Sequence, residues 1–232
     1  MVSSIMKKYS KRYQEGSKKV EPEKVYSGAE AIAVLKKVKA AKFDETVELA
    51  CRLGVDLKKG ELVVRGTAAL PHGTGKKVRI LALVKEAQVA EATEAGADFV
   101  GLDEYIAKIS GGWTDFDVAV TTPDCLKDVA RLGKILGPRG LMPSPKNGTV
   151  TTTTGQTIKE LKAGRVDFRM DKGGNVHLPI GKISFEEQAL SENLKSALDA
   201  INASAPSAVK GQFLKRAYLS TTMGPSLIIK AT

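Results

Sequence analysis

The chain has 232 residues, of which 42% are hydrophobic and 27% charged, as in a soluble globular protein with one large domain or two small ones. It has no apolar run near the ~18 residues that a membrane span requires, and its basic amino terminus lacks the apolar centre of a secretory signal. We therefore expect a cytoplasmic protein without a membrane partner. The formal net charge of +10 predicts a polyanionic partner, with nucleic acid as the first choice. Aromatic residues make up only 5%, which favours recognition of nucleic-acid shape and backbone over base stacking.

The first predicted helix begins after Ser27, because Ser27 and Glu30 have the spacing of a capping box. The stretch "FDETVELACRLG" that follows alternates apolar and polar residues, as a strand with one wet face does. Its apolar side would carry Phe43, Val47, Leu49, Cys51 and Leu53. Its polar side would carry Asp44, Thr46, Glu48 and Arg52.

The region from Lys77 to Leu132 contains three successive strand and helix pairs, which predict a parallel sheet covered by helices on both faces. Thr122 followed by Pro123 predicts an N-cap with proline at the first helical position. A further helix is predicted from a capping box of Thr157 with Glu160 and ends at Gly164, and the strand "RVDFRM" follows it.

The carboxyl-terminal part resembles the amino-terminal flank rather than this block. "VHLPIGKI" predicts a strand, Ser184 with Glu187 predicts a capped helix, and "RAYLSTT" and "SLIIK" predict the last strands. Neither flank alone has enough elements to enclose a core. We therefore expect a split two-layer α+β domain formed by both termini, residues 1–73 and 171–232, with an inserted Rossmann-like three-layer α/β domain, residues 74–170. The split domain carries a net charge of +8 and the insertion +2, so the polyanion should bind the split domain.

Two glycine-rich stretches and the scarce histidines bear on catalysis. "PHGTGKKV", residues 71–78, fails the Walker and dinucleotide patterns and is better explained as a flexible connection. "LGKILGPRGLMPSPKNGT", residues 132–149, is either a binding loop or a proline-stiffened cover over the sheet edge. His72 fits a loop residue, and His177 is either an ordinary strand side chain or an RNA contact. Cys51 and Cys125 lack metal spacing and are expected as buried free thiols.

No catalytic residue, metal site or cofactor follows from these features. The alternative is an enzyme that binds a nucleotide or a phosphorylated substrate in the inserted domain, which a fold alone does not exclude.

Seven stretches, in order along nearly the whole chain, resemble the signatures of the bacterial family of large-subunit ribosomal protein one. They are "KFDETVEL", "VRGTAALPHGTGKKVRILAL", "EAGADFVG", "FDVAVTTPD", "LGKILGPRGLMPSPKNGTV", "KAGRVDFRMDKGGNVHLPIGK" and "YLSTTMGPS". The resemblance implies the same split domain with a Rossmann-like insertion. It implies a mobile stalk protein of the ribosome, monomeric when free, that binds large-subunit ribosomal RNA and exit-site tRNA and in many bacteria represses its own messenger RNA.

The resemblance also implies an RNA-binding face. Its residues would be Lys42, Phe43, Thr46, His177, Lys182, Ser184, Thr222, Met223 and Gly224. The hydroxyls suit a ribose 2′-OH, which is both donor and acceptor, and the lysines suit phosphates. For Phe43 a core position remains the alternative, because strand alternation places it on the apolar face.

The two domains are expected to swing relative to each other. The predicted hinge comprises Gly73, Thr74, Gly75, Met170 and Asp171, since both crossings are short and glycines absorb large dihedral changes. At the end of "YLSTTMGPS", alternation predicts that Thr222 lies on the face opposite Thr221, and Gly224 with Pro225 bends the chain.

Overall fold

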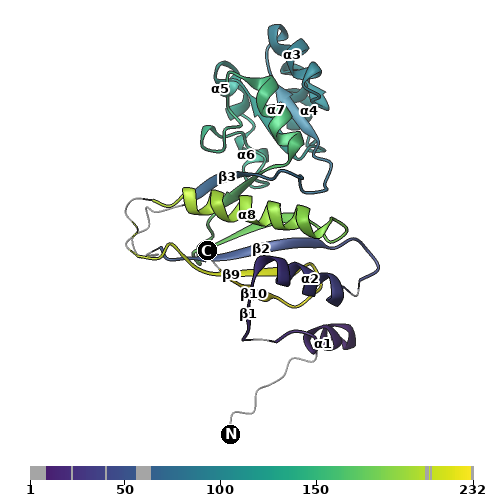
Figure 1. Cartoon of the computed structure of the whole chain (residues 1–232). Coiled ribbons are helices and arrows are strands. Elements are labelled where there is room, and N and C mark those ends of the chain that lie inside the picture. Colours follow the sequence, from purple (N-terminus) through teal and green to yellow (C-terminus); the bar gives the residue numbers. More distant parts are fainter. Residues whose placement is uncertain are drawn as a thin grey trace. The chain divides into compact units, whose positions relative to one another are not determined.

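The structure is a computed structural model that describes residues 9–21, 23–39, 41–55, 64–206, 209 and 211–230. The chain has a mixed α/β fold and forms two compact units (Figure 1). The split unit comprises residues 1–64, 70–74 and 168–232, and the inserted unit comprises residues 65–69 and 75–167.

The split unit is built on a five-stranded sheet in the order β1-β10-β9-β2-β8. Neighbouring strands are antiparallel except β1, which runs parallel to β10. The strands are β1 (Val25–Tyr26), β2 (Thr46–Leu53), β8 (Asn175–Lys182), β9 (Leu214–Thr221) and β10 (Leu227–Ile229). The helices of this unit are α1 (Lys11–Ser17), α2 (Gly28–Val38) and α8 (Glu187–Ala203).

Helices α2 and α8 pack on one face of this sheet and leave the other face open (Figure 1). The apolar stripe of α8 is buried, and it consists of Leu190, Leu194, Leu198 and Ile201. Strand β2 alternates as predicted, with Val47, Leu49, Cys51 and Leu53 buried toward the helices. The predicted two layers are therefore present, because each element buries one apolar side against the other.

Three local predictions in the split unit have different outcomes. The capping box of Ser27 and Glu30 is confirmed, with both reciprocal hydrogen bonds present. The prediction that Ser184 caps α8 is wrong, because the N-cap residue is Glu186 and makes no side-chain capping bond. The core alternative for Phe43 is also wrong. Strand β2 begins only at Thr46, and Phe43 is 51% exposed.

The inserted unit contains a parallel sheet in the order β5-β4-β6 and part of a two-stranded sheet, β3-β7. The strands are β3 (Arg65–Ala69), β4 (Ile80–Leu83), β5 (Phe99–Val100), β6 (Val118–Thr121) and β7 (Arg165–Arg169). The α-helices are α3 (Val89–Glu94), α4 (Asp103–Ser110), α5 (Leu126–Ala130), α6 (Gly133–Leu136) and α7 (Thr154–Ala163). The 3-10 turns are η2 (Glu86–Gln88), η3 (Pro123–Cys125) and η4 (Pro145–Asn147).

The parallel sheet has a buried core on each face, which gives the three predicted layers. One core joins Ile80, Ala82 and Val120 to α3 and α7. The other joins Leu81 and Leu83 to α4, α5 and α6. Strands covered on both faces are apolar at successive positions, which explains the uninterrupted run in β4.

One helix start in this unit differs from prediction, and another agrees with it. Helix α7 begins at Thr154, so Thr157 lies inside it and its hydroxyl donates to the Thr153 carbonyl instead of forming a capping box. The left-handed Gly164 ends α7 as predicted. Thr122 is the N-cap residue of η3 and Pro123 follows at its first position, as predicted, although the Thr122 hydroxyl donates to Cys125 Sγ instead of accepting from a backbone N–H. Both cysteines are free and buried, as predicted.

The connections are more ordered than their glycine content suggests. Lys76, of the stretch "GTGK", forms an ion pair with Asp117 at 2.7 Å and leads into β4 without an intervening helix, unlike a phosphate-binding loop. In residues 132–149, Leu132 and Leu136 of the segment pack into the core with Leu81 and Leu83, while residues 137–140 are exposed, so the segment has a buried part and an exposed tip. Arg65–Ala69 groups with the inserted unit, unlike the predicted boundary, because β3 pairs with β7.

Within the described ranges, no helix is long and apolar enough to cross a bilayer.

Candidate nucleic-acid interface

Three segments that are far apart in sequence meet at one end of the five-stranded sheet. Strand β2 lies between β8 and β9 and is antiparallel to both, so its start is flanked by their ends. Thr46 is paired with Lys182, and Val47 with Thr221. The segments 42–46, 182–184 and 222–224, which hold all the predicted RNA contacts except His177, are therefore neighbours. We call them the three-segment site.

Hydrogen bonds join these segments through Thr46. Its backbone N–H donates to Thr222 Oγ1 at 3.1 Å, and its carbonyl accepts from the Thr222 N–H at 3.1 Å. Lys182 Nζ donates to Thr46 Oγ1 at 2.9 Å. Thr222 and Lys182 are thus both held by Thr46, and Thr222 remains exposed to solvent.

A bulge in the β2–β8 ladder brings Lys182 to this site. The register shifts between Val47 and Glu48, and Gly181 lies opposite Val47 with φ of +152°. A bulge inserts one extra residue and reverses which face the following side chain takes. Lys182 therefore points to the same side as Thr46 instead of into the core.

Ser184 belongs to the site through Asp44. Asp44 Oδ2 accepts from the Ser184 hydroxyl at 2.8 Å, and Asp44 Oδ1 accepts from the Ser184 N–H at 3.2 Å. This pair fixes the segment after β8 onto the segment before β2. The Ser184 oxygen still has lone pairs for a further donor.

Glu45 is the residue of this site that sequence reasoning missed. It is only 1% exposed, and its carboxylate accepts from the backbone N–H groups of Ala41 at 3.3 Å and Met223 at 3.1 Å. Its own carbonyl accepts from the Ile183 N–H at 2.9 Å. Glu45, in the first segment, is therefore hydrogen-bonded to both of the other segments. The only signal in the sequence was an acidic residue in a position where strand alternation expects an apolar one.

Two exposed large apolar side chains belong to the three-segment site. Phe43 is 51% exposed and Met223 is 46% exposed, which is unusual for residues of their size. Gly224 follows Met223 in a tight turn, with its N–H bonded to the Thr221 carbonyl at 3.2 Å. A Cβ on Gly224 would overlap Thr221 Oγ1, so this turn needs glycine for packing within the protein itself.

His177 lies away from the other predicted contacts. It pairs with Ala50 on the open face of the sheet, four positions along β2 from Thr46, which is about 13 Å. Its Nε2 is 3.9 Å from Asp171 Oδ2. Hydrogen bonds from Asn175, first from its backbone and then from its side chain, lower the pKa of Asp171.

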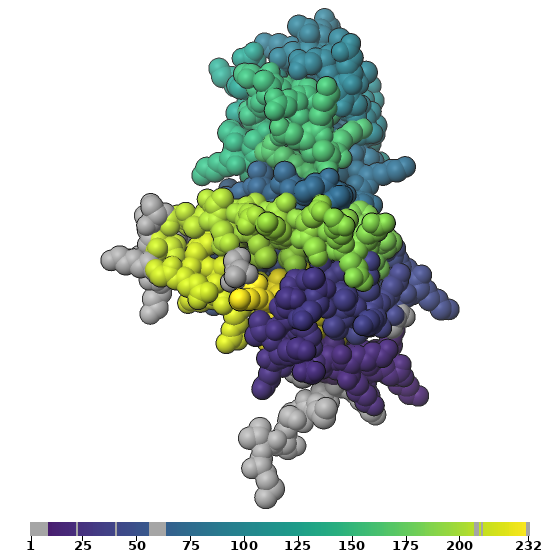
Figure 2. All heavy atoms as spheres, in the orientation of Figure 1, coloured from purple at the N-terminus to yellow at the C-terminus, as the bar shows by residue number. Residues whose placement is uncertain are grey.

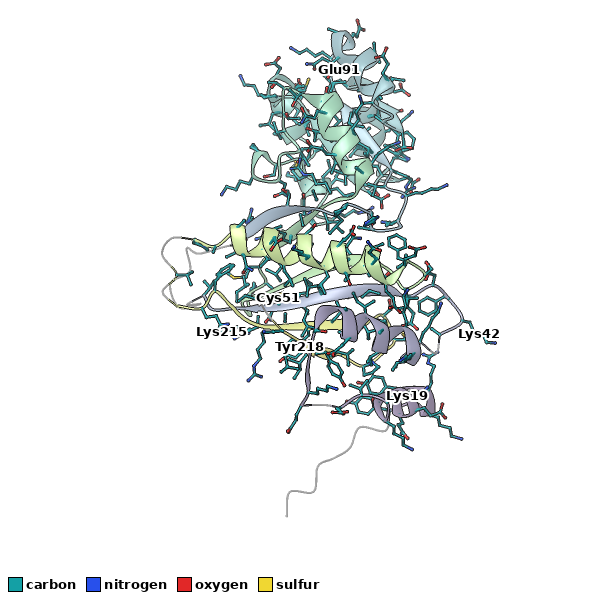
Figure 3. The ribbon with its side chains drawn as sticks, in the orientation of Figure 1. Lys19, Lys42, Cys51, Glu91, Lys215 and Tyr218 are labelled. Atoms are coloured by element: carbon teal, nitrogen blue, oxygen red, sulfur yellow. The ribbon has the colours of Figure 1, made fainter. Side chains whose placement is uncertain are left out.

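Lys42 is exposed at the same end of the split unit, and Figure 3 shows Lys42 and Lys19 at this end and Lys215 at the opposite one. The cations Lys42 and Lys182 stand beside the carboxylates Asp44 and Glu45. Both carboxylates accept hydrogen bonds from within the protein, and Glu45 is buried, whereas Asp44 is exposed like Lys42. This arrangement suits a polyanion whose backbone carries acceptors as well as charge.

The sequence signature described as the ribosomal protein L1p/L10e family matches residues 35–225. The chain belongs to this family. It is also 53% identical over 222 residues to a protein named large ribosomal subunit protein uL1 from Kosmotoga olearia, with 96% of each chain covered. In the L1p/L10e family, binding of ribosomal RNA is general. The family match spans the whole three-segment site but leaves out α1.

The predicted hinge residues lie near a buried amide in the split unit. Asn193 is fully buried; its Oδ1 accepts from the His72 N–H at 3.1 Å, and its Nδ2 donates to the carbonyls of Gly73 at 3.0 Å and Ile180 at 2.8 Å. The left-handed Gly73 is thereby fixed to α8 and β8, and the left-handed Gly75 follows Thr74. On the return crossing, the Met170 N–H donates to the Val64 carbonyl at 2.9 Å.

Asp171 continues that return crossing. It accepts from Asn175 through both carboxylate oxygens, at 2.7 Å and 3.1 Å. The return segment is therefore also bonded within the split unit.

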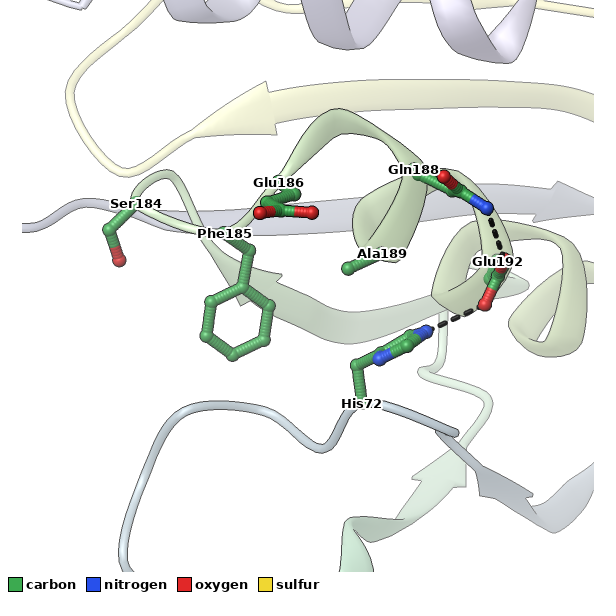
Figure 4. A pocket seen from close by; sticks show the side chains of 7 residues that line it. All are labelled: His72, Ser184, Phe185, Glu186, Gln188, Ala189 and Glu192. Atoms are coloured by element: carbon green, nitrogen blue, oxygen red, sulfur yellow. Dashed lines mark hydrogen bonds and ion pairs between the residues drawn. The ribbon is translucent and has the colours of Figure 1, made fainter.

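His72 borders an open pocket of the split unit of about 440 Å³, whose other end is formed by Ser184 and Phe185 (Figure 4). Its Nε2 lies 2.6 Å from Glu192 Oε2, and this contact, with a bond from Gln188, lowers the pKa of Glu192. Among the described residues, no three His, Cys, Asp or Glu are grouped to hold a metal ion. His72 and Glu192 thus form an exposed side-chain contact at the surface of the split unit.

Proposed function

We propose that this chain is a structural protein of the large ribosomal subunit that binds a folded segment of large-subunit ribosomal RNA through the three-segment site, with His177 as an outlying contact. The observation that carries the proposal is the junction at Thr46. There Thr222 and Lys182 are brought together by direct hydrogen bonds from strands remote in sequence.

In this proposal each kind of side chain has one task. Lys42 and Lys182 neutralise phosphates, and the hydroxyls of Thr46, Ser184 and Thr222 exchange hydrogen bonds with ribose 2′-OH groups. Phe43 and Met223 cover apolar ribose or base edges, and Gly224 lets the RNA approach the backbone. The protein acts on the ribosome in the cytoplasm, is a monomer when free, and needs no cofactor or catalytic residue.

The finer steps are part of the same proposal. The bound protein forms a mobile stalk, the inserted domain swings about the crossings at residues 73–75 and 170–171, and the stalk contacts outgoing tRNA and assists its release. A segment of the protein's own messenger RNA that mimics the ribosomal site would compete for the same surface and repress translation.

The test is a set of binding titrations with the full-length protein. Overlapping fragments of large-subunit ribosomal RNA, tRNA and the leader of its own messenger are compared at several salt concentrations. One ribosomal fragment should bind at least about 10³-fold more tightly than unrelated RNA of the same length. Uniform binding to all fragments would contradict a specific site, and selective binding of a free nucleotide instead would favour an enzyme.

A further inference from the structure

Helix α1 is a basic element outside the region that defines the family. It spans Lys11–Ser17, with Lys18 and Lys19 directly after it. Glu15 is the one acidic residue within the helix itself, and among the described residues no ion pair is formed by the four cations at its two ends. Those four are Lys11, Arg12, Lys18 and Lys19, and all are exposed. Exposed charges without a counter-ion are available to a polyanion.

The helix packs against the turn that carries Met223 through Gly16. Gly16 is buried, and a Cβ there would lie 3.0 Å from Val38 Cγ1 and 3.7 Å from Pro225 Cδ. A side chain at position 16 would therefore have to displace Val38 by a few tenths of an ångström, and glycine lets the helix pack without that shift. Figure 2 shows the α1 region directly against the adjoining amino-terminal part of the split unit, with its side chains projecting outward.

This packing places Arg12 beside the three-segment site. Arg12 and Tyr13 line one small hollow together with Glu45, Met223 and Gly224. The first turn of α1 is therefore continuous with the exposed surface of the turn at residues 222–224.

Exposed rings accompany the exposed charge. Tyr9 is 54% exposed and stacks on Tyr13 with ring centroids 4.8 Å apart. Phe43 and Met223, two of the other large apolar side chains exposed in the described part of the chain, belong to the three-segment site. A surface that combines cations with accessible rings suits RNA, because phosphates and base or ribose faces are presented together.

From these observations we propose that α1 is a fourth segment of the RNA-binding surface. Lys11 and Arg12 contact phosphates beyond the Met223 turn, and Tyr9 stacks on a base or ribose there. The proposal rests on the proposed function, since its partner is the same ribosomal RNA. It predicts that the RNA footprint continues past the three-segment site on the side of α1.

The experiment uses the full chain and the ribosomal RNA fragment that binds most tightly. The double variant Lys11→Ala and Arg12→Ala should flatten the slope of log affinity against log salt by about one unit per lost contact. Tyr9→Ala should weaken binding about fivefold or more and leave that slope unchanged, because stacking involves no counter-ion release. Lys195→Ala, which removes one exposed cation from α8 in the helical layer, is the control, and the slopes are compared per charge removed.

A double-mutant cycle tests the packing. Gly16→Val should push α1 away from Val38, so adding Arg12→Ala to it should have less effect than adding it to the wild type. Melting curves and circular dichroism establish that each variant folds.

The outcomes separate the two proposals. If Lys42→Ala weakens RNA binding while the Lys11, Arg12 and Tyr9 variants match Lys195→Ala, the role of α1 is wrong and the proposed function stands. If no ribosomal fragment binds selectively, both are wrong. If the α1 variants bind RNA as tightly as the wild type but no longer bind an acidic protein that the wild type binds, the α1 surface serves a protein interaction and the proposal is overturned.

Discussion

The carboxylate of Glu45 accepts a hydrogen bond from the backbone N–H of Met223, at 3.1 Å, across 178 positions of sequence. The same carboxylate holds the Ala41 N–H at 3.3 Å. A carboxylate is an acceptor only, so it can bind two N–H donors at once, and each such bond is stronger than a neutral one. The position of the exposed Met223 is therefore set by a carboxylate that is itself buried.

We expect Glu45→Gln to loosen the Met223 turn. Glutamine has the same shape, but its NH₂ group would face one of the two N–H donors and leave it unpaired, at a cost of about 1–3 kcal/mol. Amide hydrogen exchange at Met223 should accelerate, urea unfolding should shift by that amount, and RNA affinity should fall. Glu48→Gln, an exposed neighbour in β2, is the matched control. Unchanged exchange at Met223 in Glu45→Gln would contradict this role.

Glu45 also shows where prediction from the sequence stops. The alternation in β2 is confirmed from Val47 onward, but its extension back to Phe43 is wrong, because the strand begins at Thr46. Periodicity reports which side of a strand faces a core, and it carries no information on where pairing begins. That start depends on bonds to Thr222 and Lys182, which lie far away in sequence.

The predictions of helix caps are limited in the same way, because contacts with residues remote in sequence decide them. Ser27 with Glu30 is a capping box because both partners are local. Ser184 with Glu187 has the same spacing, but the Ser184 hydroxyl is bonded to Asp44 instead. Local spacing identifies a helix start only when no remote carboxylate competes for the hydroxyl. The fold class and the family followed from apolar runs and from whole motifs, which do not depend on one contact.

Lys42→Ala should reduce the salt dependence of RNA binding. Lys42 is an exposed residue of the three-segment site, so removing its charge removes about one phosphate contact and flattens the log–log slope by about one unit. Titrations between low and physiological salt measure this slope, with Lys195→Ala as the control. A slope equal to that of the wild type would show that no phosphate lies at Lys42.

Asn193→Ala should destabilise the crossing at Gly73. The substitution removes the partner of the His72 N–H and of the Gly73 and Ile180 carbonyls, so we expect a loss of at least about 2 kcal/mol in the free energy of unfolding. Single-molecule distances between probes on the two domains should also broaden, because the hinge is no longer anchored. His72→Ala, which removes only the exposed pair with Glu192, is the control. Equal effects of the two substitutions would contradict the anchor.

The thiol of Cys51 predicts a loss of stability in alkali. Burial raises the pKa of Cys51 from 9.0 to about 12, so between these values the unfolded chain has released the proton and the folded chain keeps it. Stability is therefore full below pH 9 and falls as pH rises toward 12, by up to about 1.4 kcal/mol per pH unit. Urea unfolding of Cys125→Ala with and without Cys51→Ala isolates this slope. Identical slopes above pH 9 would show that the thiol does not contribute.

Thr222 gives the sharpest test of the RNA contact, because its hydroxyl has two separable roles. The oxygen accepts from the Thr46 N–H at 3.1 Å. The hydroxyl proton is donated to the Thr46 carbonyl at 3.4 Å, and that carbonyl also accepts from the Thr222 N–H at 3.1 Å. The 3.4 Å bond is the longer of the two, so in the proposed complex an RNA acceptor such as a 2′-oxygen would replace it.

Thr222→Val keeps the shape and removes both roles, so RNA affinity should fall by about 1–3 kcal/mol while the salt slope stays constant. Thr222→Ser keeps the hydroxyl and should bind like the wild type. Thr221→Val is the control, since Thr221 is 6% exposed and packs beneath Gly224. Titrations at several salt concentrations, with melting curves for each variant, make the comparison. Wild-type affinity in Thr222→Val would refute the contact. A loss confined to Thr221→Val would mean that the RNA approaches the opposite face of β9, where the side chains are buried against the helices.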